Sequence, residues 1–425
     1  MTADPEAAAS APPEEEDVPV DETGAAIVDQ SFAGYVRRWW QKVRSGDLGS
    51  LPILVGLVVI VLVFGTLDDV FLTERNFTNL LLQTAPFAIL AIGIVFVLLI
   101  GEIDLSVAFV SAVGGVVMTL LIRPDDPGFP WWAAIAVALA TTTAIGFVHA
   151  LIITKAGVPS FVVTLAGLLI WSGVVLYLMT EATTTGTIRI SDDAIVALAN
   201  EFLPPAWGYV IGAVVVVGYT LSQLQTARSR RAGGLDSKPL PILATQIAGL
   251  AVVTFGAIAY ANQDRGFPVV FLILGVFLVF WTFVASRTRF GRHVYAVGGN
   301  PEAARRAGIN VDRVRIAVFM INGFMAGAGG IILASRLRSV ATGSGGGDLL
   351  LNVIAAAVIG GTSLFGGIGR VVSALLGALV IASINSGMNL LGLSQGLKFI
   401  ITGMVLLAAV LVDALSKRSR ARSGG

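Results

Sequence analysis

The sequence predicts an all-α, polytopic membrane protein, and its composition and apolar patterning lead to this fold class. Hydrophobic residues make up 55% of the 425 positions, whereas charged residues make up only 13%. The mean hydropathy of +0.84 is far above that of a soluble domain. Apolar runs close to the ~20 residues needed to cross the hydrocarbon core recur along the chain. We count about twelve, at 51–67, 80–100, 105–122, 132–153, 160–180, 207–225, 241–261, 268–285, 314–334, 348–365, 371–391 and 396–415.

The distribution of Lys and Arg predicts how these segments are oriented. With the N-terminus inside, 21 of the 28 cationic residues fall in segments that face the cytoplasm. This asymmetry follows the positive-inside rule, so both termini are expected in the cytoplasm. Stretches 80–122 and 348–391 carry polar or glycine interruptions, and some of their segments are expected to be broken or re-entrant helices.

Regions outside the spans divide the chain further. Residues 1–34 form an acidic, Ala- and Pro-rich tail that is expected to be disordered, because it has little apolar surface to bury. Residues 35–50 begin with YVRRWWQKVR and are expected to be an interfacial anchor. Residues 51–418 form the transmembrane domain, with a charged cytoplasmic segment at 287–315, and 419–425 form a basic tail. No role is assigned to the acidic tail.

Several chemistries are excluded by residue content. The chain has no cysteine and only two histidines, His149 and His293, so neither a metal site nor thiol or histidine catalysis is expected. The net charge of +1 gives no basis for nucleic-acid binding. No G-x-x-x-x-G-K-[ST] motif is present, and the glycine-rich run at 343–348 lacks the lysine. We therefore expect a non-enzymatic chain that binds no cofactor itself and takes its energy from a partner.

The segment 287–315 is the longest charged interruption of the second half and contains seven arginines. Within it, Asn300 suits a helix N-cap, Pro301 the first helical position and Gly308 a left-handed C-terminal residue. A short capped basic helix at 300–308 is suited to docking a soluble partner on the cytoplasmic face. A solvated loop that only sets topology explains the charges equally well.

Two carboxylates interrupt an early apolar stretch. Glu102 and Asp104 lie in IGEIDLS, and a glycine-rich break at 359–369 lies at a comparable depth from the other end. Paired interruptions of this kind are typical of a transporter's path or gate. For Asp104 the simpler interpretation is preferred, in which its side chain caps the following helix through the amide of residue 106 or 107. For Glu102 the two interpretations stay open.

Neutral amides and hydroxyls recur in the late spans. They suit a polyhydroxylated solute, but they serve equally well as hydrogen bonds between helices. The candidate substrate pathway or gate therefore comprises Glu102, Asp104, Asn322, Asn352, Thr362, Ser363, Asn385 and Asn389.

Five stretches together resemble a known family. They are GEIDLSV (101–107), VPSFVVTLAGLL (158–169), FGRHVYAVGGNPEAARRAGINVDRVRIAVFMINGFMAG (290–327), AAAVIGGTSLFGGIG (355–369) and GMVLLAAVLVDALSKR (403–418). The chain is similar over about 50–418 to the sugar-permease subunits of bacterial ABC importers of the ribose/xylose type. The likeness is greatest to the D-xylose type, which shares the extra basic loop here at 228–237.

The resemblance implies a homodimeric permease of the bacterial inner membrane. An ATP-binding subunit, which carries ATP and Mg²⁺, would dock inside, and an extracytoplasmic sugar-binding protein would deliver D-xylose or a related pentose. The coupling residues implied by the match, with the two arginines of the same helix, are Gly298, Gly299, Asn300, Pro301, Glu302, Ala303, Arg305, Arg306 and Gly308. The alternatives are an importer of another sugar or small furanose signal, a secondary transporter, and a structural or receptor-like membrane protein.

Overall fold

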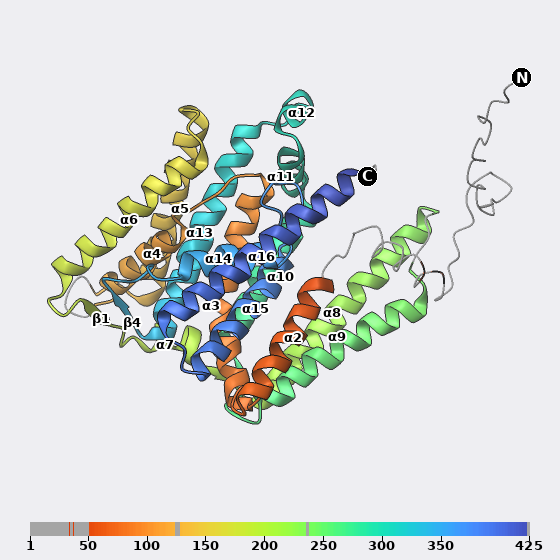
Figure 1. The fold of residues 1–425 in the computed structure, drawn as a ribbon, viewed down its shortest axis with the longest axis horizontal. Helices are drawn as coiled ribbons and strands as arrows, with labels where there is room; N and C mark the ends of the chain where they lie inside the picture. Colours follow the sequence, from red (N-terminus) through yellow and green to blue (C-terminus); the bar gives the residue numbers. More distant parts are fainter. Residues whose placement is uncertain (1–33, 35–36, 38–50, 124–127, 235–237, 423–425) are drawn as a thin grey trace, which may run out of the picture.

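The computed structural model describes residues 34, 37, 51–123, 128–234 and 238–422, and Figure 1 shows them as a bundle of long helices. The long helices are α2 (Leu51–Leu67), α3 (Glu74–Leu99), α4 (Val107–Leu121), α5 (Trp131–Lys155), α6 (Ser160–Ala182), α8 (Pro205–Ala232), α9 (Leu240–Ala261), α10 (Val269–Arg287), α13 (Val311–Leu337), α15 (Val372–Leu390) and α16 (Gln395–Arg422). The shorter elements are helices α7 (Asp193–Asn200), α11 (Arg289–Gly299), α12 (Pro301–Arg306) and α14 (Leu349–Ile359), and strands β1 (Thr187–Arg189), β2 (Phe202–Leu203), β3 (Phe267–Pro268) and β4 (Ser339–Ala341). The predicted tail at 1–34 and anchor at 35–50 fall almost entirely outside the described residues.

Helix α3 lies at the centre of the bundle. Nearly every residue from Leu81 to Ile100 is buried, and the helix packs against α13 on one side and α15 on another. Helix α13 also packs against α4 and α5. By contrast, α6, α8, α9 and α10 expose large apolar side chains, including Leu169, Val252 and Val279. Exposed apolar faces on this scale fit a lipid environment, where the spanning helices satisfy their own backbone groups.

Close backbone approach holds the centre together. A Cβ atom at Gly323 of α13 would collide with the carbonyl oxygen of Thr142 on α5, and one at Gly330 would collide with that of Ser111 on α4. Helices gain little hydrophobic energy by associating in lipid, so contacts that let backbones touch contribute much of their packing energy. The glycines of α13 therefore fix its distance from both neighbours.

The count of about twelve transmembrane segments, some of them broken or re-entrant, is not confirmed. Eight helices of the described chain are long and apolar enough to cross a membrane, and four apolar helices are shorter: α2, α4, α14 and the described apolar part of α16. At 1.5 Å per residue, α4 extends over roughly 22 Å and α14 over roughly 16 Å, less than the ~30 Å core. Irregular segments at 100–106 and 360–371 adjoin them. The stretches expected to be interrupted thus contain short helices beside irregular backbone.

The two ends of the bundle differ in construction. At one, called the α12 end, lie α11, α12 and the irregular segments 100–106 and 360–371. At the other, called the α7 end, α7 lies beside two antiparallel pairs, β1 with β4 and β2 with β3. Helix α2 starts and α16 finishes at the α12 end (Figure 1). That this end faces the cytoplasm stays a prediction.

Candidate coupling element and buried polar cluster

The helix predicted at 300–308 is confirmed as α12. The side chain of Asn300 accepts a hydrogen bond from the amide of Ala303 at 3.0 Å, and Pro301 occupies the first helical position. Gly308 closes the helix with a φ of +82°, a left-handed conformation that glycine adopts without strain. These capping residues stabilise a helix of only six residues, which would not form alone in water.

The charged side chains of α12 are exposed. Glu302 is 69% exposed and Arg305 is 54% exposed, and the two form an ion pair within the helix. Arg306 is also exposed, whereas Ala304 is buried and anchors the opposite face. Figure 1 shows α12 projecting at its end of the bundle. The helix is therefore accessible to a soluble partner.

Helix α11, which contains the predicted coupling residues Gly298 and Gly299, connects α12 to the core. A Cβ atom at Gly298 would collide with the carbonyl oxygen of Leu99, the last residue of α3. That same oxygen accepts a hydrogen bond from the amide of Gly367 at 2.9 Å. The hydroxyl of Tyr295 donates to the carbonyl oxygen of Gly369 at 2.8 Å. The end of α3 is thus held between α11 and the 360–371 segment by main-chain contacts, beside the side-chain hydrogen bond of Tyr295.

The hydroxyl of Tyr295 stays protonated in this position. Burial raises the pKa of the Tyr295 hydroxyl, and the charge of Arg370 opposes part of that rise. A protonated phenol keeps its hydrogen bond to the main chain across the physiological pH range. The contact between α11 and the 360–371 segment is therefore insensitive to pH in that range.

Glu102 forms an ion pair with Arg315, near the start of α13. One carboxylate oxygen lies 3.0 Å from a terminal guanidinium nitrogen, and the side chains are 13% and 26% exposed. The Nε atom of Arg315 is buried without a hydrogen-bond partner in the described part of the chain. The pair ties the segment that follows α3 to the first turns of α13.

Asp104 forms the local hydrogen bond that the sequence predicted, and a second one over long range. One carboxylate oxygen accepts from the amide and hydroxyl of Ser106, at 2.7 and 2.6 Å. The other accepts from the side-chain amide of Asn322 at 2.6 Å, across 218 residues of sequence. Helix α4 begins at Val107 with Ser106 as its N-cap, so Asp104 precedes the cap and is no capping residue itself. Two predicted pathway residues meet here.

Helix α6 completes this polar cluster with residues that sequence reasoning missed. The hydroxyl of Ser160 accepts from the amide of Ile103 at 3.2 Å. The hydroxyl of Thr164 donates to the Ser160 carbonyl oxygen within α6 at 2.9 Å and also lies 3.3 Å from the Ile103 carbonyl oxygen. One turn farther on, Gly167 lets the ring of His149 approach, and Trp171 donates to His149 Nε2 at 3.1 Å. The spacing 160, 164, 167, 171 marks one face of a helix, a signal that could have identified the group.

The remaining pathway candidates do not join this cluster. Asn352 of α14 and Thr362 of the 360–371 segment are buried, and their side-chain polar atoms contact no hydrogen-bonding group among the described residues. Ser363 lies beside Thr362 at the α12 end. Asn385 is half-buried, and Asn389 is exposed near the α7 end, where Lys398 donates to it. The predicted set is therefore spread along the bundle and is not one site.

Comparison with known proteins identifies the family. Residues 76–410 match the family described as the permease component of the branched-chain amino acid transport system. The chain belongs to this permease family. The permease is 38% identical over 377 residues to the xylose transport system permease protein of Escherichia coli K12, covering 88% of this chain and 94% of that one. No solved structure matches the permease.

Two further relatives extend the likeness. The xylose transport system permease protein of Haemophilus influenzae is 36% identical over 383 residues, covering 89% of this chain and 99% of the relative. The ribose import permease protein of Escherichia coli K12 is 34% identical over 388 residues, covering 91% of this chain and 99% of the relative. The chain is a multi-pass inner-membrane transport subunit and not an enzyme, and it is similar to the permeases of xylose and ribose transport systems.

Proposed function

We propose that this chain is the membrane subunit of an ATP-driven importer of D-xylose or a related pentose. Supporting the pentose is the identity to xylose permeases of two organisms over nearly their whole length. The absence of charged residues from most of the candidate pathway suits an uncharged sugar. The alternative within the family is an importer of another sugar or of a small furanose signal. The similarity to the ribose permease supports this alternative.

Energy enters through α12 in this proposal. A separate subunit binds ATP and Mg²⁺ and docks on the exposed charges of Glu302, Arg305 and Arg306. Its motion passes from α12 to α11, and through the contact of Gly298 with Leu99 to the end of α3. That backbone contact is the observation that carries the proposal, because two rigid elements in van der Waals contact move together.

The polar groups that follow α3 form the inner gate. Residues 100–106 are held to α13 by the ion pair of Glu102 with Arg315 and by the hydrogen bond of Asp104 with Asn322. A displacement of Leu99 strains both contacts at once. Alternating access then consists of making and breaking them, while an extracytoplasmic sugar-binding protein delivers solute at the α7 end. The working unit is a homodimer.

Uptake into vesicles tests this proposal. The chain is reconstituted with an ATP-binding subunit and a sugar-binding protein, and labelled D-xylose uptake is measured with ATP, without ATP, and with a proton gradient alone. We expect uptake only with ATP and both partners. Uptake by the chain alone, driven by the proton gradient, would establish a secondary transporter and overturn the proposal. D-Ribose in place of D-xylose decides between the sugars.

A further inference from the structure

The α7 end contains a cavity that the proposed gate does not use. Its volume is about 200 Å³, and it lies between α4, α13 and the loop 339–349. We propose that this cavity receives an uncharged, polyhydroxylated solute of monosaccharide size before it passes the membrane. The inference rests on the proposed function and adds to it a place and a size limit for the solute.

The volume restricts the ligand. Drug-sized ligands occupy pockets of at least ~300 Å³, so this cavity suits a smaller ligand. A monosaccharide fits such a space, whereas a disaccharide would extend beyond it through the open side. The loop above the cavity has glycines at four of the five positions 343–347.

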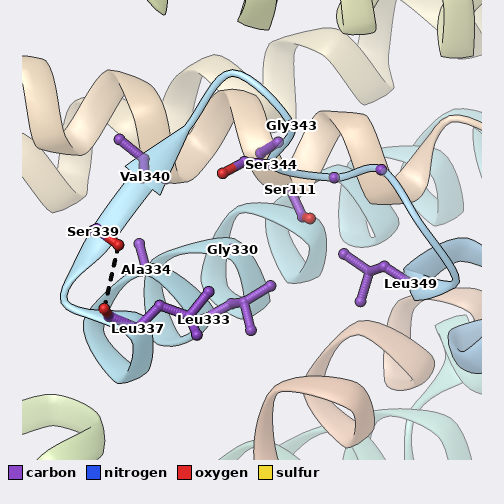
Figure 2. A pocket seen from close by; sticks show the side chains of 14 residues that line it. Ser111, Gly330, Leu333, Ala334, Leu337, Ser339, Val340, Gly343, Ser344 and Leu349 are labelled. Carbon is purple, nitrogen blue, oxygen red and sulfur yellow. Dashed lines mark hydrogen bonds between the residues drawn. The ribbon is translucent and has the colours of Figure 1, made fainter. Parts of the chain in front are cut away.

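The lining restricts the ligand's charge. All fourteen lining residues are neutral, so an ionised solute would lose its hydration without gaining a counter-charge. Three serines, visible in Figure 2, supply polar groups. The hydroxyls of Ser111 and Ser339 donate to main-chain oxygens at 2.6 and 3.2 Å, which leaves their oxygens free to accept. The Ser344 hydroxyl accepts from the amide of Ala341 at 3.0 Å and keeps its proton for donation.

This arrangement matches sugar hydroxyls, each of which is both donor and acceptor. The loop that carries Ser344 is held in place at both ends. Strand β4 pairs with β1 on one side, and α14 begins with Leu349 on the other. Between them, Gly345 has a φ of +82° and lies so close to the main-chain oxygen of Ala108 on α4 that a side chain would not fit.

The cavity lies at one end of the contact between α4 and α13. Its floor is the crossing where Gly330 touches the main chain of Ser111 and Gly115 packs beside it. At the other end of the same two helices, Asp104 accepts its hydrogen bond from Asn322. The tight crossing separates the cavity from the proposed inner gate.

The absence of native cysteine permits a direct test. Single variants Ser344→Cys and Ser339→Cys place a thiol at the cavity, and Ser394→Cys places one on an exposed loop at the same end of the bundle. Each is introduced into the full importer in vesicles. The rate at which each thiol reacts with a membrane-impermeant methanethiosulfonate reagent is measured without solute, with saturating D-xylose, with D-xylonate and with sucrose.

We expect D-xylose to slow modification of the two cavity thiols several-fold and to leave Ser394→Cys unchanged. D-Xylonate, which is charged, and sucrose, which is too large, should protect none of them. Modification of either cavity thiol should block ATP-driven uptake, because it fills the cavity. Ser→Cys is nearly isosteric, and thermal unfolding of each solubilised variant before labelling confirms that it is folded.

The outcomes separate this inference from the proposed function. Cavity thiols that do not react, or that react equally fast with and without D-xylose in importers that still transport it, would refute the cavity and leave the importer intact. Protection by sucrose or D-xylonate would refute the limits on size or charge. Failure of the unmodified importer to take up any sugar with ATP would refute the proposed function, whatever the labelling shows.

Discussion

The α12 end and the α7 end of the permease are built by different means. At the α12 end, main-chain atoms touch directly at Gly298 and Leu99, and the charges of Glu102 and Arg315 are paired. At the α7 end, short antiparallel pairs support neutral hydroxyls around a cavity. The α12 end has to pass on a displacement, which requires rigid contacts between close-packed atoms. The α7 end has to receive a solute, which requires a cavity and polar groups that can exchange hydrogen bonds with water for hydrogen bonds with the solute. The difference therefore follows the roles that we propose for the two ends.

The largest effect is expected from neighbouring glycines at the α12 end. Gly298→Ala introduces a Cβ atom into the space of the Leu99 oxygen, at a cost of ~1–3 kcal/mol for such overpacking. ATP-driven D-xylose uptake should fall roughly tenfold or more. Gly299→Ala is the matched control, because nothing lies within 4 Å of its Cβ position. Equal uptake by the two variants, at equal amounts in the membrane, would contradict transmission through α11.

The next effect concerns two buried asparagines. Asn322→Leu removes the partner of Asp104 and leaves a buried polar group unsatisfied, which costs about 1–3 kcal/mol. Asn352→Leu removes an amide that contacts no hydrogen-bonding group in the described chain, so stability should be unchanged or higher. Thermal unfolding of the detergent-solubilised protein measures both. If Asn352→Leu lowered the melting temperature more than Asn322→Leu does, the assignment of Asn322 to the polar cluster would be wrong.

Exchange of charges distinguishes docking from helix stability. In Glu302→Arg with Arg305→Glu the ion pair within α12 can re-form, and an exposed pair contributes only ~0–1 kcal/mol. The protein should therefore stay in the membrane while sugar-stimulated ATP hydrolysis and uptake become uncoupled. The matched exchange at the α7 end, Asp264→Arg with Arg265→Asp, should leave that coupling intact. Full uptake in the α12 variant would remove α12 as the coupling element.

The smallest effect is expected from Glu102→Gln. The glutamine keeps an acceptor for Arg315 but loses the charge, and for this partly exposed pair we expect a loss near the ~1 kcal/mol upper limit of surface pairs. Uptake should fall a few-fold if the pair closes the inner gate, with expression unchanged. Addition of salt should weaken the wild-type contact in the same direction. Unaltered flux would leave Glu102 as a structural residue only.

Local features of the fold were predictable from the sequence. Asn300, Pro301 and Gly308 determine α12 through capping rules that operate within one turn, and the structure follows them. The hydrogen bond from the Ser106 amide to Asp104 is equally local. The short helices α4 and α14 lie in the stretches whose polar or glycine interruptions indicated a break. In each case the determining groups are near in sequence.

Contacts over long range were not predictable in the same way. Nothing in the composition of α13 and α14 shows that Asn322 faces Asp104 while Asn352 faces no partner among the described residues, because all are polar residues in apolar runs. The count of about twelve spans stays unconfirmed, since a run of apolar residues does not reveal where a helix stops inside it. The role of Gly298 became visible only when α11 was placed against Leu99.

The hydrogen bond between Asp104 and Asn322 has a consequence for biogenesis. The two residues are 218 positions apart, so at 5–20 residues per second the ribosome makes Asn322 about 10–45 s after Asp104. During that interval α3 and α4 are already inserted without the helix that will cover them. The nascent chain must therefore keep a carboxyl group near the lipid headgroups, or shielded by insertion factors, until α13 arrives. Completion of the inner gate is thus a late event in synthesis.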